Sequence, residues 1–175
     1  MEVRILRQPT DNDWAWAYYL ATVTTGTHSR RVPTTVWRHR ILKAGHSPIR
    51  TLMWTIELRD VPYWVSVHLV RHKVGVEHFV RSQRNDRQSA YDRTKAPQDA
   101  PVTHVMDVNA AALMQICRMR LCGKAAPETR AVAEAIRDAI YAASPEFEGL
   151  LAPTCERYGV CDEMRPCGRL HEAQA

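Results

Sequence analysis

The chain has 175 residues, of which 45% are hydrophobic, and its formal net charge is +5. This length fits one domain with a substantial core, and no apolar run approaches the length that a bilayer requires. The N-terminus shows no basic and then apolar leader with a cleavage site, so we expect a cytoplasmic protein without membrane contact. The positive charge favours an anionic partner, either a nucleotide or a nucleic acid.

The first third of the chain predicts two strands and two helices. Residues 2–8 are typical of a short strand, and carboxylates cap a helix that starts at residue 11. A second helix is predicted over residues 33–44, where Gly45 supplies the C-terminal cap. Apolar and polar residues alternate over residues 50–59, which is the clearest strand signal in the sequence.

The segment over residues 61–87 carries the strongest functional signal. It begins as a helix that is apolar at all but two positions, one of them His68, which indicates burial. The helix leads into Arg71-His72-Lys73, and Ser82 and Arg84 follow. Clustered cations after a buried helix favour a loop that holds phosphate, because Arg offers bidentate donors and Lys a point charge. The competing interpretation is a solvated group of charges.

The second half of the chain predicts a loop and two long helices. Residues 85–101 are polar and loop-like, and Asp107 can cap a helix over residues 108–122. An amphipathic helix follows over residues 127–143. The elements together predict an α+β fold, with a small mixed or antiparallel sheet, a buried central helix and flanking helices.

The last part of the chain is rich in cysteine. We expect a single domain over residues 1–151 and a separate Cys-rich tail over residues 152–175. Three tail cysteines recur at equal six-residue steps and are candidate metal ligands: Cys155, Cys161 and Cys167. With Cys122 or His171 as a fourth ligand, they could hold zinc or an iron–sulfur cluster. The spacing is not a Cys-x-x-Cys motif, and the alternative is three unrelated reduced thiols.

The order of these features resembles the flavin-dependent thymidylate synthase family. That family carries Arg-His-Arg, seven residues and then Ser, whereas this chain has Arg71-His72-Lys73, eight residues and then Ser82-Gln83-Arg84. The resemblance covers roughly residues 33–151 and is strongest over residues 52–84. It identifies the chain as a short and divergent relative.

Several positions depart from the family pattern. Asn109 and Ala110 match a family segment that begins Asn-Ala-Arg, but Ala111 replaces the Arg that helps to grip the pyrimidine nucleotide. The connection after Arg84 is shorter than the helical insertion expected there. These differences concern the substrate site more than the scaffold.

The resemblance implies an enzyme that moves a one-carbon unit from methylenetetrahydrofolate to dUMP. Reduced FAD would supply the hydride, NADPH would be a co-substrate, and a homotetramer would share its active sites between subunits. The positions that carry over as flavin-binding are Arg71, His72, Lys73 and Asn109. Those that carry over as nucleotide-binding are Ser82, Arg84 and His68.

Two other functions stay open from the sequence alone. A relative with a changed substrate, for example one that hydroxymethylates a pyrimidine nucleotide, is compatible with Ala111 and the short connection. A nucleic-acid-binding module without enzymatic activity is compatible with the positive charge, the Arg-rich segment and the Cys-rich tail.

Overall fold

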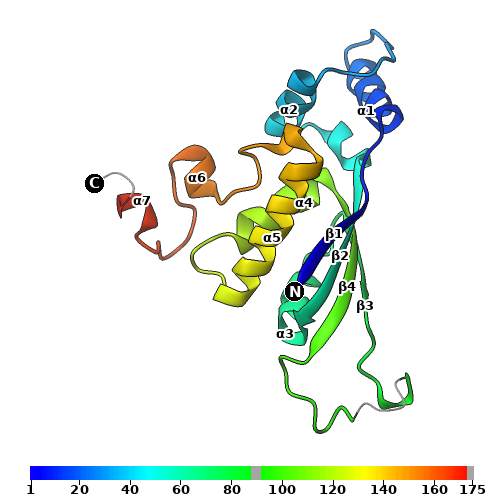
Figure 1. Ribbon diagram of the computed structural model, residues 1–175. Helices are drawn as coiled ribbons and strands as arrows, with labels where there is room; N and C mark the ends of the chain where they lie inside the picture. Colours follow the sequence, from blue (N-terminus) through cyan, green and yellow to red (C-terminus); the bar gives the residue numbers. More distant parts are fainter. Residues whose placement is uncertain (88–91, 173–175) are drawn as a thin grey trace.

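The computed structural model describes residues 1–87 and 92–172. One antiparallel sheet of four strands, in the order β1-β2-β4-β3, carries helices on one of its faces (Figure 1). The predicted α+β fold is therefore confirmed, with a fully antiparallel sheet. The strands are β1 (Glu2–Arg7), β2 (Met53–Pro62), β3 (Val76–Val80) and β4 (Pro101–Asn109).

Long helices surround the upper and left sides of this sheet in Figure 1, and short ones connect or follow them. The α-helices are α1 (Asp11–Val23), α2 (Thr35–Ala44), α3 (Tyr63–Leu69), α4 (Ala110–Arg120), α5 (Pro127–Ala143), α6 (Thr154–Tyr158) and α7 (Arg169–Glu172). The 3₁₀ helices are η1 (Ser47–Thr51), η2 (Asn85–Arg87) and η3 (Pro145–Phe147). None of the helices in the described ranges is both long and apolar enough to cross a membrane.

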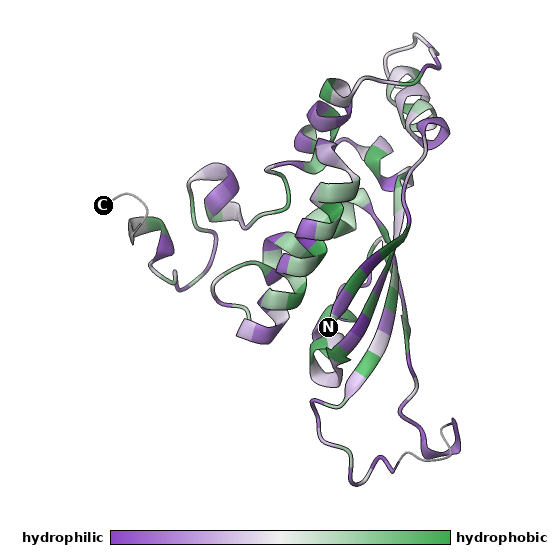
Figure 2. Cartoon of the chain, in the orientation of Figure 1, coloured by the Kyte–Doolittle hydropathy of each residue, from purple (hydrophilic) through white to green (hydrophobic). Residues whose placement is uncertain are grey.

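The core lies between the sheet and the α4–α5 pair. Alternation along β2 places Trp54, Ile56 and Leu58 on the covered face, and each is fully buried. Ile116 of α4 and Ile136 of α5 are buried in the same cluster. In Figure 2 green positions are concentrated in α4, α5 and the strands, whereas green and purple positions alternate along the tail. Burial of this apolar surface is the main contribution to stability.

Two adjacent strands run directly into helices. β2 ends at Pro62 and α3 begins at the next residue, and β4 ends at Asn109, where α4 begins at once. The Asn109 side chain accepts a hydrogen bond from the Ala112 amide at 2.9 Å and so caps α4. Because β2 and β4 are antiparallel, Pro62 pairs with Pro101 and Asn109 with Met53, so α3 and α4 start from opposite ends of this strand pair.

Several predicted boundaries agree closely with the structure. α5 spans the predicted residues, and Gly45 ends α2 with a φ of 68° in the left-handed region. The prediction that Asp107 caps a helix from residue 108 was wrong, because Asp107 lies inside β4 and α4 starts at Ala110 with Asn109 as its cap. The buried face of β4 is Val102, His104, Met106 and Val108. The histidine in that set obscures the apolar alternation of the strand.

Candidate functional site

Arg71 and Arg120 lie close together where the loop after α3 meets the C-terminal end of α4, and Lys73 lies two residues further along that loop. We call Arg71, Lys73 and Arg120 the cation cluster. The Arg120 guanidinium donates from Nε to the His72 ring at 3.0 Å and from Nη2 to the His68 carbonyl at 2.8 Å. Burial, and then the nearby Arg71 guanidinium, lower the pKa of Arg120. Within the described ranges no carboxylate forms an ion pair with any member of the cluster.

The protonation of His72 follows from its contact with Arg120. A guanidinium only donates, so His72 Nε2 must accept and carries no proton. Burial, followed by the charges of Arg120 and His78, lowers the pKa of His72 to about 4. His72 is therefore neutral near pH 7, and the charge of this site comes from the cation cluster.

A histidine pair fixes the backbone of the same loop. His78 Nε2 donates to the His72 carbonyl at 2.8 Å, and His78 Nδ1 lies 2.9 Å from His104 Nε2. In its neutral form His78 then accepts from His104, which leaves His104 Nδ1 unprotonated. That atom is buried and has no partner among the described residues. Burial, and then the His78 charge, lower the pKa of His104 to about 4, so His104 is neutral near pH 7.

Gly75 brings the loop against the start of α4. Its φ of +76° lies in the left-handed region, and a Cβ at this position would lie 2.4 Å from Asn109 Nδ2. The backbone N–H of Asn109 donates to the Gly75 carbonyl at 2.9 Å. Asn109 is therefore committed on one side to the helix cap and on the other to the loop. Its predicted contact with flavin is an additional role that these bonds do not test.

A cavity of about 200 Å³ lies between this loop and α4. Its lining consists of His72, Lys73, Val74, Ala112 and Gln115. It thus brings two of the predicted flavin-binding residues to the first turns of α4, where free amide groups and the helix dipole favour negative charge. The cavity is smaller than typical ligand pockets of about 300–1,000 Å³, so it fits part of a dinucleotide.

His68 lies beside this site on α3. Its Nδ1 is 2.9 Å from the Thr129 hydroxyl of α5, and its ring packs edge-on against Trp64. Burial, followed by the positive charges of Arg120 and Arg71, lowers the pKa of His68. His68, His72 and the cation cluster therefore form one connected group that spans α3, α4 and α5.

The other two predicted nucleotide-binding residues lie apart from that group. Ser82 and Arg84 belong to an irregular segment after β3, which we call the distal segment (residues 82–87). The Ser82 hydroxyl accepts from the Arg84 amide at 3.3 Å, and the Arg84 guanidinium pairs with Asp86 at 2.6 Å. Arg84 lines an open hollow of about 590 Å³ together with Arg93 and Thr94. This hollow shares no lining residue with the cavity beside α4.

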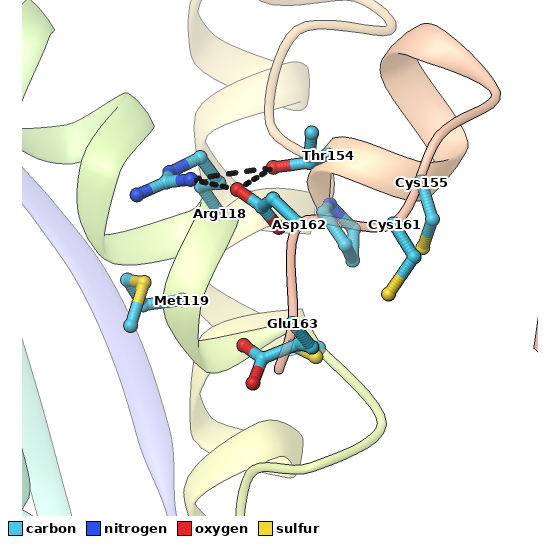
Figure 3. Close-up of a pocket in the computed structure, with 9 residues that line it drawn as sticks. Arg118, Met119, Thr154, Cys155, Cys161, Asp162 and Glu163 are labelled. Atoms are coloured by element: carbon cyan, nitrogen blue, oxygen red, sulfur yellow. Dashed lines mark hydrogen bonds and ion pairs between the residues drawn. The ribbon is translucent and has the colours of Figure 1, made fainter. Parts of the chain in front are cut away.

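The cysteines of the predicted metal site are also placed by the structure. Cys155 and Cys161 lie side by side at a hollow that Cys122 also lines (Figure 3). In the part of the chain that the structure describes, no three His, Cys, Asp or Glu side chains stand ready to hold a metal ion. The side chain of His171, the other predicted fourth ligand, lies outside the described positions.

Comparison with known proteins shows what this chain is similar to. The family model described as "Thymidylate synthase complementing protein" matches residues 87–146, which include β4, α4 and α5. No curated protein matches the sequence significantly. The resemblance to flavin-dependent thymidylate synthases that the sequence predicts is therefore confirmed, although the family match begins after the Arg-His-Lys motif.

Two solved structures show the same fold. One is flavin-dependent thymidylate synthase ThyX from Helicobacter pylori in complex with FAD and dUMP, with a TM-score of 0.67 and 16% identity over 86% of this chain and 99% of that one. The other is a Helicobacter pylori Thymidylate Synthase X with FAD and dUMP, with a TM-score of 0.63 and 14% identity over 79% of this chain and 93% of that one. At this low identity the likeness establishes the fold.

Sequence reasoning missed three residues of the site: Arg120, His78 and His104. Arg120 reads in the sequence as an ordinary basic residue in the last turn of a helix. A helical count would have shown that it shares a face with the apolar positions of α4, which is unusual for an unpaired cation. The contact between His78 and His104 depends on the pairing of β3 with β4, which local sequence does not reveal.

Proposed function

We propose that this protein is an enzyme similar to flavin-dependent thymidylate synthases. It would transfer a one-carbon unit from methylenetetrahydrofolate to dUMP, with reduced FAD as hydride source and NADPH as reductant. The observation that carries the proposal is the cavity at the start of α4, which Lys73 of the cation cluster lines together with His72, in a fold shared with proteins that bind FAD and dUMP.

The residues beside α4 fit a group that carries phosphates. Arg71 and Lys73 supply charge from one side, and Arg120 supplies it from the end of α4. Cations that lack carboxylate partners in the described part of the chain are costly to gather, and a bound anion offsets their repulsion. When FAD is bound there, its reduced ring supplies the hydride. Neutral His72 and the His78–His104 pair hold the loop in place, so the donors are oriented before the anion arrives.

The nucleotide would bind through His68, Ser82 and Arg84. The structure leaves His68 Nε2 without a hydrogen-bond partner among the described residues, so this nitrogen is available to a base or to the flavin ring. Arg84 would contact the phosphate of dUMP after exchanging its bond with Asp86. Since Ala111 offers no donor, we expect the phosphate to be recognised more strongly than the pyrimidine.

A homotetramer with shared sites completes this proposal. The cavity beside α4 takes only part of FAD, and the distal segment lies at a separate hollow. The face of the sheet opposite α4 and α5 also carries Phe79, which is 60% exposed. Light scattering of the purified protein tests the assembly, and a stable monomer that still binds FAD and dUMP would contradict shared sites.

Titration with FAD tests the proposed cofactor. We expect saturable binding with a shift of the flavin absorption spectrum, and loss of that binding in Arg71→Ala. Lys43→Ala, at the exposed end of α2, is the matched control and should bind FAD normally. Turnover of dUMP with methylenetetrahydrofolate and NADPH then tests the reaction. A protein that ignores FAD, or that binds it equally well as Arg71→Ala, contradicts the assignment.

A further inference from the structure

The C-terminal tail, here residues 152–172, has little to hold it in place by packing. Among residues 154–170 no side chain is buried, and Met164 is fully exposed. Helices α6 and α7 have five and four residues, which is too short for stability on their own. In Figure 1 the tail extends away from the sheet to the left of α4 and α5.

Polar contacts tie the tail to the domain at only a few points. Asp162 accepts hydrogen bonds from Arg118 of α4 and from Thr154, as Figure 3 shows. Arg169 pairs with Glu156 within the tail at 2.7 Å. Exposed ion pairs contribute little to stability in water. The described contacts therefore hold the tail to the domain only weakly.

Four of the five cysteines face the same region, where the tail meets the end of α4. A hollow of about 190 Å³ is lined by Cys122, Cys155 and Cys161, and an adjoining one of about 290 Å³ by Cys155, Cys161 and Cys167. Cys167 also approaches α4, because a Cβ added to Gly123 would lie 3.3 Å from its Sγ. The two hollows share Cys155 and Cys161, so the four cysteines line two neighbouring hollows at this junction.

We infer that Cys122, Cys155, Cys161 and Cys167 form a four-thiolate metal site that fastens the tail to α4. Zinc and iron–sulfur clusters both take four thiolates, and zinc requires Zn–S distances of about 2.3 Å. The thiols do not meet such a geometry as they stand, since no three ligands are gathered within the described residues. The weakly packed tail would close around the metal, and each thiol that binds would release its proton to water.

The arrangement selects Cys122 as the fourth ligand and excludes the fifth cysteine. Cys122 lies just beyond α4 and lines the first hollow. Cys117 is fully buried in the core between α4 and α5, where burial raises its pKa to about 12. Asp162 also lines the first hollow, but its carboxylate is already bound by Arg118 and Thr154. Asp162 therefore positions the loop that carries Cys161.

Metal analysis of the full chain tests this inference independently of flavin. The protein is purified anaerobically without chelators, and its zinc, iron and acid-labile sulfide are measured. We expect either about one zinc ion per chain, or iron with sulfide and visible absorption, and the two results distinguish the two centres. Failure to bind metal during purification and during a later Zn²⁺ titration overturns the site.

Matched alanine variants identify the ligands. Cys161→Ala and Cys167→Ala alter exposed residues, so the domain should keep its circular dichroism spectrum while the metal content falls to near zero. Cys122→Ala should also lose the metal, and retention there would overturn its role as fourth ligand. Cys117→Ala should retain the metal, and its loss in a folded Cys117→Ala protein would contradict the assignment.

Limited proteolysis gives a second measurement. Removal of the metal with a chelator should make the tail sensitive to protease while α4, α5 and the sheet stay protected. Equal resistance of the tail with and without metal, or a disulfide between tail cysteines in the reduced and purified chain, would overturn the inference.

Discussion

The loop after α3 and the distal segment both carry cations, but the structure prepares them differently. Bonds from Arg120, His78 and Asn109 fix the loop, and its cations have no carboxylate partners among the described residues. In the distal segment, Arg84 is exposed and already paired with Asp86. Preorganised, unpaired cations favour strong anion binding, whereas a paired cation must exchange one partner for another. Two groups of cations with similar composition can therefore differ in their affinity for an anion.

The largest effect should follow from breaking the contact between the loop and α4. Gly75→Ala would place a methyl group 2.4 Å from Asn109 Nδ2 at a φ of +76°. Left-handed strain and overpacking together should lower the free energy of unfolding by about 2–5 kcal/mol, measured by urea denaturation. Gly149→Ala is the matched control, since its φ is +71° and no atom lies within 4 Å. Equal losses in both variants would show that Asn109 does not support the loop.

The histidine pair should make stability depend on pH. The pKa of His104 is about 4 in the folded chain, against an ordinary value of 6.5. The unfolded chain binds the extra proton between these values, so stability should fall as the pH drops from 6.5 towards 4. The loss from His104 should be at most about 3 kcal/mol. Urea denaturation across this range should show a shallower slope for His104→Phe, whereas a variant of the exposed His46 should follow the wild type. Parallel slopes for wild type and His104→Phe would contradict the assignment of a buried, neutral His104.

The next effect concerns the charge at the end of α4. Arg120→Gln removes a cation and both bonds to the loop, so FAD binding should weaken about ten- to a hundredfold. Arg118→Gln, on the same helix, changes a residue that pairs with Asp162 in the tail and should leave FAD affinity unchanged. Fluorescence titration with FAD makes the comparison. Arg120→Lys should be intermediate, because it keeps the charge but loses the planar fork.

The smallest effects are expected in the distal segment. Arg84→Ala should weaken dUMP binding by no more than about fivefold, because an exposed pair contributes roughly 0.2–1 kcal/mol. Asp86→Asn should strengthen binding by a similar factor, since it releases Arg84 from its present partner. Calorimetric titration with dUMP measures both. A hundredfold loss in Arg84→Ala would mean that the two segments are equivalent after all.

The sequence predicts the elements whose signals are local. The Pro127 start and apolar spacing define α5, and strict alternation identifies β2, although its bounds lie about three residues further along. The sequence does not predict β3 and β4, because His78 and His104 occupy positions where a strand pattern requires apolar residues. In the structure these two residues satisfy each other across the β3–β4 pair, a contact that no local window contains.

The residues of the candidate site also fall into two groups, those that the sequence predicts and those that only the fold reveals. The cations at Arg71 and Lys73 are visible in the sequence because they interrupt an apolar run. Arg120 also belongs to the cation cluster, but it lies on α4, which begins 34 residues after the start of β3. Only the fold brings Arg120 into contact with His72. Ser82 and Arg84 lie beyond the strand, because β3 ends at Val80 and an irregular segment follows.

The direct passage from β4 into α4 determines where this protein can change in length. One residue inserted after Asn109 would turn every later side chain of α4 by about 100° around the helix axis, so Arg120 would no longer meet His72. An insertion in the connection between β3 and β4 would leave both strands in register. Length variation among relatives should therefore collect in that connection and be absent from the strand–helix junctions, and a library of single-residue insertions screened for folding would reveal the same division.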